Sequence, residues 1–375
     1  MNLGTDKELQ LPFFVKASIF LVGMIALFAI LYITRGIIVP LVFATIIAIV
    51  LHPVVNFFVR IKVNRIVAIG IVLLLTTIFF SAFFVLIFSQ VSQFSESWPL
   101  FVEKFTGTLN QSISSLASYF DIDPQKIHNW ITSTKNDFLN ISNEAIGQTL
   151  ISVGGVIMVL FLIPFYVFLL LFYQPLIIEF IHRLFCENNQ SRVREIVSQI
   201  KKVIQHYLVG LLIEAAMVGG LNSAILLALG IDYAILLGII GAMLNVIPYI
   251  GGLIAVALPM IVALATKSSA WYSFYVLIGY YIIQLIDNNY IVPYIVASKV
   301  KINALFSILV VFAGNALWGI SGMFLSIPLL AIVKLVFDHL ESLKPWGFLL
   351  GDTMPSIIKI NPILKKLKKR VLQSI

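Results

Sequence analysis

The stretch NVIPYIGG, Asn245 to Gly252, lies in the middle of an uncharged apolar block that runs from residue 233 to residue 266. As one straight helix, this block would be about 51 Å long, whereas the hydrocarbon core of a bilayer is about 30 Å thick. Proline removes a backbone donor from a helix, and glycine weakens a helix interior. The stretch therefore predicts a break between two apolar arms, each too short to span a bilayer, that fold into a re-entrant hairpin.

A second apolar block, residues 302–333, repeats the same order of small and polar residues. Each block follows a predicted spanning helix, and one crossing separates the two blocks. This is the pattern of an inverted repeat, whose broken helices meet around a substrate near the membrane midplane. Two ordinary hairpins, or eight full crossings, are the alternatives. The aligned pairs are Asn245 with Asn315, Ile250 with Ile320, Gly252 with Gly322, and Pro259 with Pro328.

The composition indicates that lipid surrounds most of the chain. Of 375 residues, 60% are hydrophobic and 11% are charged, and the mean hydropathy is +1.02, whereas soluble domains carry about 25% charged residues. No basic and aromatic module accompanies the net charge of +8, so we expect no nucleic acid as a partner. The single cysteine, Cys186, excludes an intramolecular disulfide framework and a multi-cysteine metal site.

Six segments have the length and apolar character of spanning helices. Pro164 predicts a kink in the fourth segment, Glu214 lies within the fifth, and the run Asp287-Asn288-Asn289 interrupts the sixth. The segments are 17–33, 36–59, 66–89, 150–173, 207–229 and 268–297.

The distribution of lysine and arginine sets the expected orientation. Basic residues follow the second and fourth spans and end the chain in KKLKKR, whereas 90–149 has no arginine. We therefore expect both termini in the cytoplasm and 90–149 outside the membrane. There, an apolar stripe from Phe101 to Phe120, followed by Asp123-Pro124 and a second stripe, predicts a helical pair packed on itself or on neighbouring subunits.

This organisation divides the chain into five expected parts. A three-helix membrane part precedes the outside segment, and a span with a cytoplasmic link precedes a transport unit with two broken hairpins. A basic cytoplasmic tail follows. The expected bounds are 1–89, 90–149, 150–204, 205–337 and 338–375.

Polar side chains at membrane depth are the candidate binding groups. An acid in a span is costly, so it tends to face a cavity, pair with another group or bind a proton. Glu214 and Asp287 have no lysine or arginine in the same spans, which favours a proton or hard-cation site. A protonated helix contact and a cap at a helix break are the alternatives. The candidate set is Glu214, Asn245, Pro248, Gly251, Gly252, Asp287, Asn288, Asn289, Asn315, Gly319 and Gly322.

Several of these runs resemble the autoinducer-2 exporter family of bacterial permeases. The resemblance is carried by LHPVVNFFVRIKVNR, IPYIGG, DNNYIVPYIVASKVKINAL and GISGMFLSIPLLAIVK, and it is most specific from 205 to 335. The family's Pro-Tyr-hydrophobic-Gly element matches Pro248 to Gly251, and its later elements match Pro293, Gly319, Gly322 and Pro328. Gly252 departs from the family, where many relatives have proline, and this implies a looser first hairpin.

The resemblance implies export of autoinducer-2, a quorum-sensing signal, although other members are sodium or lithium/proton antiporters. It also implies a homo-oligomer, with a pentamer as the expected assembly. The family's residues do not select between a small polar solute and a cation as substrate.

Together these patterns predict an all-α polytopic membrane protein of six spans, two re-entrant hairpins and an extracytoplasmic helical pair. The expected function is a secondary carrier in the bacterial cytoplasmic membrane that works by alternating access. A sodium or lithium/proton antiporter and a channel-like or structural oligomer are the alternatives. The chain lacks GxxxxGK[ST] and HExxH motifs, so we expect no enzyme activity and no cofactor.

Overall fold

The computed structural model describes residues 12–120, 161–184, 190–247, 251–267, 269–296 and 302–352, together with Asn129 and Ser133. These parts are helical, apart from turns and one isolated bridge. Five of the described helices are long and apolar enough to cross a membrane, or six if one bent pair counts as a single span. The prediction of an all-α polytopic membrane protein is confirmed.

The first three helices are α1 (Phe13–Ile33), α2 (Arg35–Arg60) and α3 (Arg65–Phe120). The predicted third span and the first part of the outside segment form one continuous helix, α3. Beyond residue 89 the sequence becomes more polar, but apolar residues such as Phe94 and Phe101 continue along one face, so the helix continues. The second predicted outside stripe lies outside the described residues, except for Asn129 and Ser133.

The fourth predicted span is described from Phe161 onward. Its helix, Phe161–Phe172, is followed after a bend of 61° by the amphipathic helix α5 (Gln174–Leu184). The bend lies at Tyr173, whereas Pro164, the predicted kink, lies inside the helix. Arg65 stabilises the bend, because its Nη2 donates to the Leu171 carbonyl (2.7 Å) and to Gln174 Oε1 (3.2 Å).

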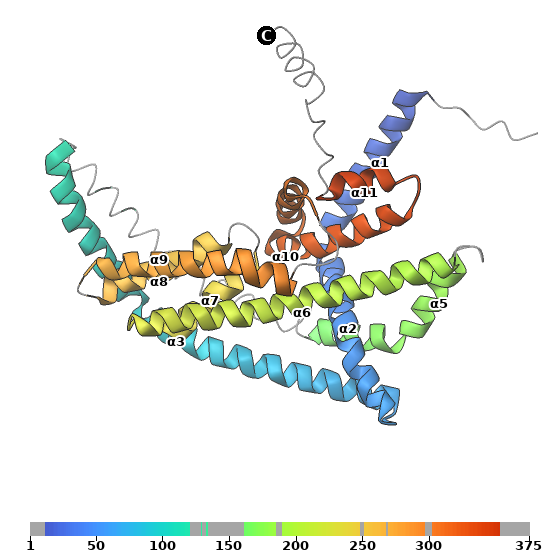
Figure 1. Cartoon of the computed structure of the whole chain (residues 1–375), viewed down its shortest axis with the longest axis horizontal. Helices are drawn as coiled ribbons and strands as arrows, with labels where there is room; N and C mark the ends of the chain where they lie inside the picture. Colours follow the sequence, from blue (N-terminus) through green and yellow to red (C-terminus); the bar gives the residue numbers. More distant parts are fainter. Residues whose placement is uncertain are drawn as a thin grey trace, which may run out of the picture.

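A bundle of helices follows, and Figure 1 shows it on one side of the molecule. It begins with α6 (Gln190–Ala228), which turns back into α7 (Ala234–Asn245). Small residues allow α6 and α7 to pack closely: a Cβ at Gly238 would collide with Ser223, and one at Gly219 would lie 3.3 Å from the Ala242 Cβ.

The break predicted within 233–266 is present. Helix α7 ends at Asn245, and α8 (Gly251–Thr266) begins at Gly251. The two helices pack on each other, and at their junction a Cβ at Gly251 would collide with the carbonyl of Leu244. Both arms are shorter than a bilayer-spanning helix, as the prediction of a hairpin requires.

The sixth predicted span consists of α9 (Trp271–Ile286) and a π-helix, η2 (Asp287–Val296). The sequence suggested that the run Asp287-Asn288-Asn289 interrupts the helix. The helix instead continues through this run, with π-helical hydrogen bonds from Asp287 onward. A π-helix places more residues in each turn and is frequent at functional sites. Here it begins at Asp287 and contains Pro293.

The second apolar block forms α10 (Ala304–His339), which is bent back on itself at Gly319. Gly319 has φ 63° and ψ −142°, a conformation that glycine adopts without steric cost. The Ser326 Oγ donates to the carbonyl of Val310 (2.9 Å), although residues this far apart in a straight helix would be separated by about 24 Å. Thus 304–318 and 320–339 are two arms of a hairpin.

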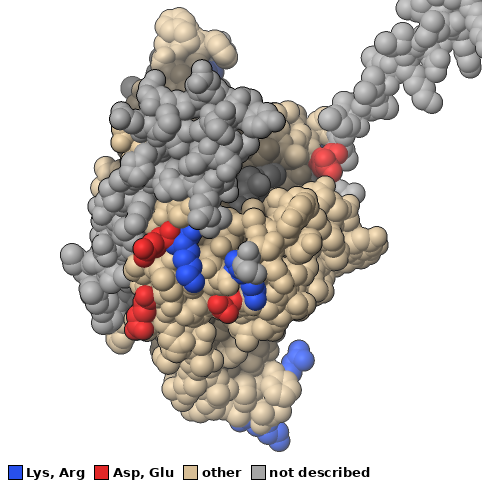
Figure 2. Space-filling model, turned by 90° about the vertical axis from the view of Figure 1, so that its left-hand side faces the viewer, with Lys and Arg blue, Asp and Glu red and all other residues tan. Residues whose placement is uncertain are grey.

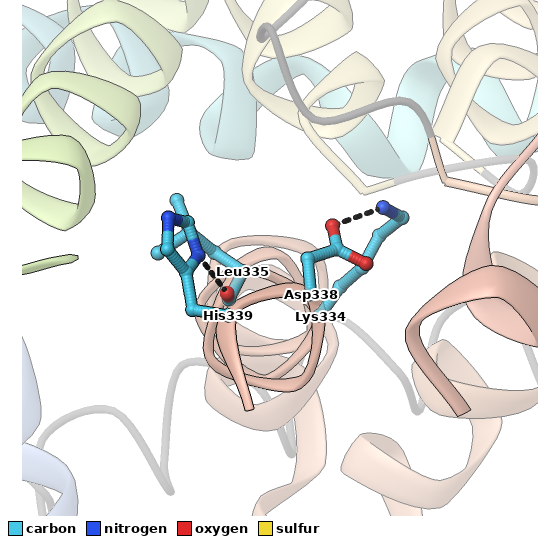
Figure 3. A network of polar contacts seen from close by, with 4 residues as sticks. All are labelled: Lys334, Leu335, Asp338 and His339. Carbon is cyan, nitrogen blue, oxygen red and sulfur yellow. Dashed lines mark hydrogen bonds and ion pairs between the residues drawn. The ribbon is translucent and has the colours of Figure 1, made fainter. Parts of the chain in front are cut away.

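The short helix α11 (Lys344–Leu350) ties the two ends of α10 together. The Asn303 N–H donates to the Leu350 carbonyl (2.9 Å), and an isolated bridge joins Ile302 to Gly351. At the other end of α10, Lys334 pairs with Asp338 at 2.6 Å (Figure 3). A Cβ on Gly347 of α11 would collide with the Asp338 carboxylate, so α11 lies directly against this end.

The surface fits a lipid environment. Helix α1 buries none of its residues, and large apolar side chains are exposed along α1, α2 and α3. Figure 2 shows one end of the molecule, where several charged side chains lie close together and a few more lie near its edges, on a surface that is mostly uncharged. We infer that lipid, or other copies of the chain, covers the uncharged area.

The described part of the segment predicted to lie outside the membrane packs on the bundle. Phe94 and Phe101 of α3 contact the ring of Tyr233, with centroids 5.5 and 6.1 Å apart, and the Tyr233 hydroxyl lies 2.9 Å from Ser97 Oγ. Phe101 is buried in the same apolar cluster as residues of α7, α8 and α9. The apolar stripe of α3 therefore covers the turn between α6 and α7.

Candidate functional site

Four polar side chains meet inside the bundle and form what we term the acid–amide cluster. Its members are Glu214 of α6, Asn245 at the end of α7, Gln284 of α9 and Asp287 at the start of η2. The Asn245 Nδ2 donates to Asp287 Oδ2 (3.0 Å) and to Glu214 Oε1 (3.4 Å). The Gln284 Nε2 donates to Asp287 Oδ2 (3.4 Å). One amide thus bridges two acids that are distant in sequence.

Both acids are buried: Glu214 is 6% exposed and Asp287 is 1% exposed. In the described part of the chain, neither forms an ion pair with a lysine, arginine or histidine. The Oδ1 of Asp287 is buried without a hydrogen-bond partner there. A buried, unpaired carboxylate oxygen is unfavourable, so a proton, a cation or water is the natural partner for this atom.

The break between α7 and α8 and the start of the π-helix position the side chains of the acid–amide cluster. Helix α7 ends at Asn245, so the amide lies at a helix end instead of on a continuous helix face. The start of α8 approaches the same groups, because a Cβ on Gly252 would lie 2.7 Å from Gln284 Oε1 and 3.5 Å from Asn245 Oδ1. The break predicted from NVIPYIGG therefore brings backbone and amide groups next to the acids.

Other predicted site residues lie at the edge of this cluster. Asn288 is exposed, and its Oδ1 accepts from Gln284 Nε2 (3.3 Å). Asn289 is also exposed, and its side chain donates to the Leu285 carbonyl (2.8 Å) of its own helix. Gly251 packs against α7 at Leu244. Pro248 lies outside the described residues.

The structure does not bring the second hairpin tip to the acids. Asn315 is exposed, and α10 packs mainly on α6, α11, α1 and α2 in the described part of the chain. Next to the bend, the Trp318 Nε1 donates to the Leu31 carbonyl of α1 (3.1 Å). Gly322 packs against Gly314 within the hairpin, and Gly319 is the bend itself. A shared site between the two tips remains a prediction.

The sequence contained a signal for one further member. Gln284 lies three residues before Asp287 and therefore on the same helix face, yet it was not in the candidate set. Tyr280 precedes Gln284 by one turn, and its hydroxyl is buried without a hydrogen-bond partner among the described groups. Periodicity alone places Tyr280 with the apolar residues of α9, because tyrosine is common in such cores.

The cluster offers oxygen ligands and amide groups. Among the described residues, no three His, Cys, Asp or Glu side chains gather as a metal site would require. Two carboxylates with amide oxygens suit a proton or a hard monovalent cation.

Comparisons with known proteins agree with a role in transport. A family model described as "AI-2E family transporter" matches residues 21–342. The chain is 25% identical over 321 residues to the "AI-2 transport protein TqsA" of Escherichia coli (strain K12), covering 84% of this chain and 90% of that protein. It is 26% identical over 250 residues to the "Putative transport protein YrrI" of Bacillus subtilis (strain 168), covering 67% of this chain and 70% of that protein.

Proposed function

The chain belongs to the AI-2E family of transporters, and on that premise we propose that it is a secondary carrier of a small polar solute. It would act in the bacterial cytoplasmic membrane with both termini in the cytoplasm, as the distribution of lysine and arginine predicts. The name of the relative TqsA makes autoinducer-2 the first organic solute to test, with quorum-sensing export as the corresponding role.

The acid–amide cluster is the observation on which this proposal rests. Two buried acids share the Asn245 amide, so a change in the charge of one alters the hydrogen bonding of the other. Binding or release of a proton or cation would change the net charge of the cluster. This gives the carrier a means of coupling ion movement to a change in conformation.

Alternating access would arise from movement of the segment 205–337 against the preceding spans. This movement would change the contacts between these parts, which include the bond from Gln205 Nε2 to the Ile49 carbonyl (2.7 Å) and the contact of Ser97 with Tyr233. Within the bundle, α6 and α7 pack through glycine and serine, which favours movement of the bundle as a rigid body.

The same cluster supports sodium or lithium/proton antiport as a second candidate function. Its described polar groups are carboxylates and amides, without an adjacent basic residue that would attract an anion. In this mechanism, Asp287 and Glu214 bind either a proton or the cation, and the cation itself is the solute.

The test uses purified protein in liposomes that contain a pH-sensitive dye. A sodium or lithium gradient is imposed, and wild type is compared with Asp287→Asn and Glu214→Gln. For an antiporter, we expect proton movement that saturates with cation and is lost in both variants. Labelled autoinducer-2 is followed in parallel, and its uptake or release in the absence of cation-dependent proton flux would identify an organic-solute carrier.

Flux that neither saturates nor depends on a counter-ion, and that both variants retain, would contradict a carrier and favour a channel.

The exposed surface of α1 supports assembly into a homo-oligomer, and a pentamer is the assembly to test by native mass spectrometry.

A further inference from the structure

A second group of buried polar side chains lies one to two helical turns from the acid–amide cluster. It consists of Asn222 on α6 and Tyr280 on α9, which are 3% and 7% exposed. Gly241 of α7 lies between them: a Cβ there would be 3.2 Å from Asn222 Nδ2 and 3.6 Å from Tyr280 Cε1. The ring carbon Cε1 is next to the carbon that bears the hydroxyl, so the amide and this edge of the phenol ring both approach Gly241.

This second group connects to the cluster through helix periodicity. Tyr280 precedes Gln284 by four residues on α9, and Gly241 precedes Asn245 by four residues on α7. Residues with this spacing are neighbours on one helix face. Gln284 and Asn245 are the two amides that donate to Asp287. The polar path therefore runs from Asp287 through these amides toward Tyr280 and Asn222.

Two atoms along this path have no hydrogen-bond partner among the described groups. They are the Tyr280 hydroxyl and Asp287 Oδ1, and both are fully buried. Buried polar atoms without protein partners are commonly satisfied by ordered water. A water molecule would supply the missing partner of the Tyr280 hydroxyl, and the buried Asn222 amide approaches the same glycine, Gly241, as the Tyr280 ring.

We propose that Asn222 and Tyr280 form a water-holding polar layer through which protons reach the acid–amide cluster. The proposal rests on the proton coupling proposed above. The Asn222 amide orients the water, and the Tyr280 hydroxyl donates its proton along the path as it accepts another from the water. One O–H bond breaks as another forms, so the phenol is neutral before and after the transfer. The layer lies on the side of the cluster that faces the turn between α6 and α7.

The first test compares Tyr280→Phe with Tyr281→Phe in the liposome assay. Tyr281 is the next residue on α9 and is 64% exposed, so its loss controls for removal of a hydroxyl from this helix. We expect Tyr280→Phe to lower the maximal cation-dependent proton flux about tenfold, as loss of one buried hydrogen bond would. The half-saturating cation concentration should stay unchanged because the acids are intact. Wild-type flux in Tyr280→Phe would overturn the proposal.

A second variant, Gly241→Ala, places a methyl group against Asn222 and the Tyr280 ring, where it would disturb the proposed water layer. We expect the same loss of maximal flux with both polar side chains still present. Gly220→Ala on α6 is the control, because a Cβ at Gly220 meets no atom within 4 Å. Unchanged flux in folded Gly241→Ala protein would contradict a water-filled layer.

Hydroxyl-radical footprinting tests the water without depending on transport. Radicals form from water, so a buried ring is modified when water lies beside it. After correction for intrinsic reactivity, we expect more modification of Tyr280 than of Phe101, which is 4% exposed. Equal, low modification would mean a dry site and overturn the proposal. If wild type shows no cation-dependent proton flux but Tyr280 is modified, the proton-coupling proposal fails and the water-holding layer stands.

Discussion

Asn245 is the residue on which the geometry of the candidate site depends most. Its single side-chain amide donates to acids from two other helices, at 3.0 Å to Asp287 and 3.4 Å to Glu214. An amide next to a carboxylate stabilises negative charge without neutralising it permanently, as lysine or arginine would. The two acids can therefore remain available to exchange protons or cations.

Replacement of Asn245 by alanine removes this donor from both acids. We expect a loss of unfolding free energy of about 1–3 kcal/mol, because the buried carboxylates lose a partner, together with loss of coupled flux comparable to that of Asp287→Asn. Thermal unfolding in detergent and the liposome assay measure the two effects. Asn56→Ala is the control, since Asn56 is exposed and its side-chain amide lies beside the ring of His52, far in the chain from the two acids. Normal coupling in Asn245→Ala would show that the amide bridge is not needed.

Gly252→Ala tests whether the start of α8 positions Gln284. The new Cβ would lie 2.7 Å from Gln284 Oε1, which is the end of a flexible side chain and can move. We expect Gln284 to lose its 3.4 Å contact with Asp287 and the flux to fall severalfold, while stability changes by less than about 1 kcal/mol. The assay compares this variant with Gly220→Ala. Equal flux in the two variants would show that transport does not depend on the position of Gln284.

At the scale of helices, two hairpins are built by different devices. In the first, α7 and α8 are separate helices joined through the Pro248 region, and Gly251 allows the arms to meet. In the second, the backbone reverses at Gly319, and Ser326 joins the arms by donating to the Val310 carbonyl. Both devices place glycine where two backbones approach each other.

Gly314→Ala should open the second hairpin. A Cβ at this position would collide with Ser326 and would lie 2.5 Å from the Gly322 carbonyl oxygen, so the arms must separate. We expect a loss of about 1–3 kcal/mol of stability from overpacking, measured by thermal unfolding in detergent. Gly23→Ala on α1 is the matched control, because nothing lies within 4 Å of its Cβ and alanine favours helix. Equal stability of the two variants would contradict close packing of the α10 arms.

On the scale of the whole molecule, the proposed carrier requires the bundle to move against the first spans. Several described contacts join them. Helix α3 covers the turn between α6 and α7 through Phe94, Phe101 and Tyr233. Gln205 of α6 reaches α2, and Trp318 of α10 donates to the Leu31 carbonyl of α1. An open pocket of about 500 Å³ lies beside the first contact, lined in part by Ser97, Lys104 and Asp232. This contact is where movement can be blocked without altering the acids.

Cross-linking this contact should stop transport. Cysteines replace Ser97 and Tyr233, whose hydroxyls are 2.9 Å apart, in a Cys186→Ser background, and a short bifunctional thiol reagent joins them. We expect flux to fall to the level of protein-free liposomes. The control pair, Lys267→Cys with Tyr272→Cys, lies within the bundle, where the Lys267 Nζ is 5.5 Å from the Tyr272 ring centroid. Full flux after cross-linking of the first pair would show that α3 and the bundle move together.

The sequence by itself determined the solvent, the helical class and the two breaks. Length, charge and apolar runs suffice for these features, because a bilayer accepts only helices of sufficient length whose backbone bonds are satisfied internally. The break at NVIPYIGG was predictable since proline and glycine act locally on a helix. The same reasoning identified Glu214 and Asp287, because an acid is costly at membrane depth wherever it lies.

Only the tertiary structure decided which of these residues meet. Sequence periodicity could not show that Asn245 bridges Glu214 and Asp287, or that Asn315 lies apart from them, because the contacts join different helices. The continuation of α3 and the π-helix at Asp287 were likewise not predicted. The polarity of the sequence indicates where a helix leaves lipid, but not where the helix itself ends, as α3 shows. The change to a π-helix at Asp287 cannot be read from the residues of that segment alone. Local chemistry therefore identified the candidate groups, and packing between distant helices assembled the site.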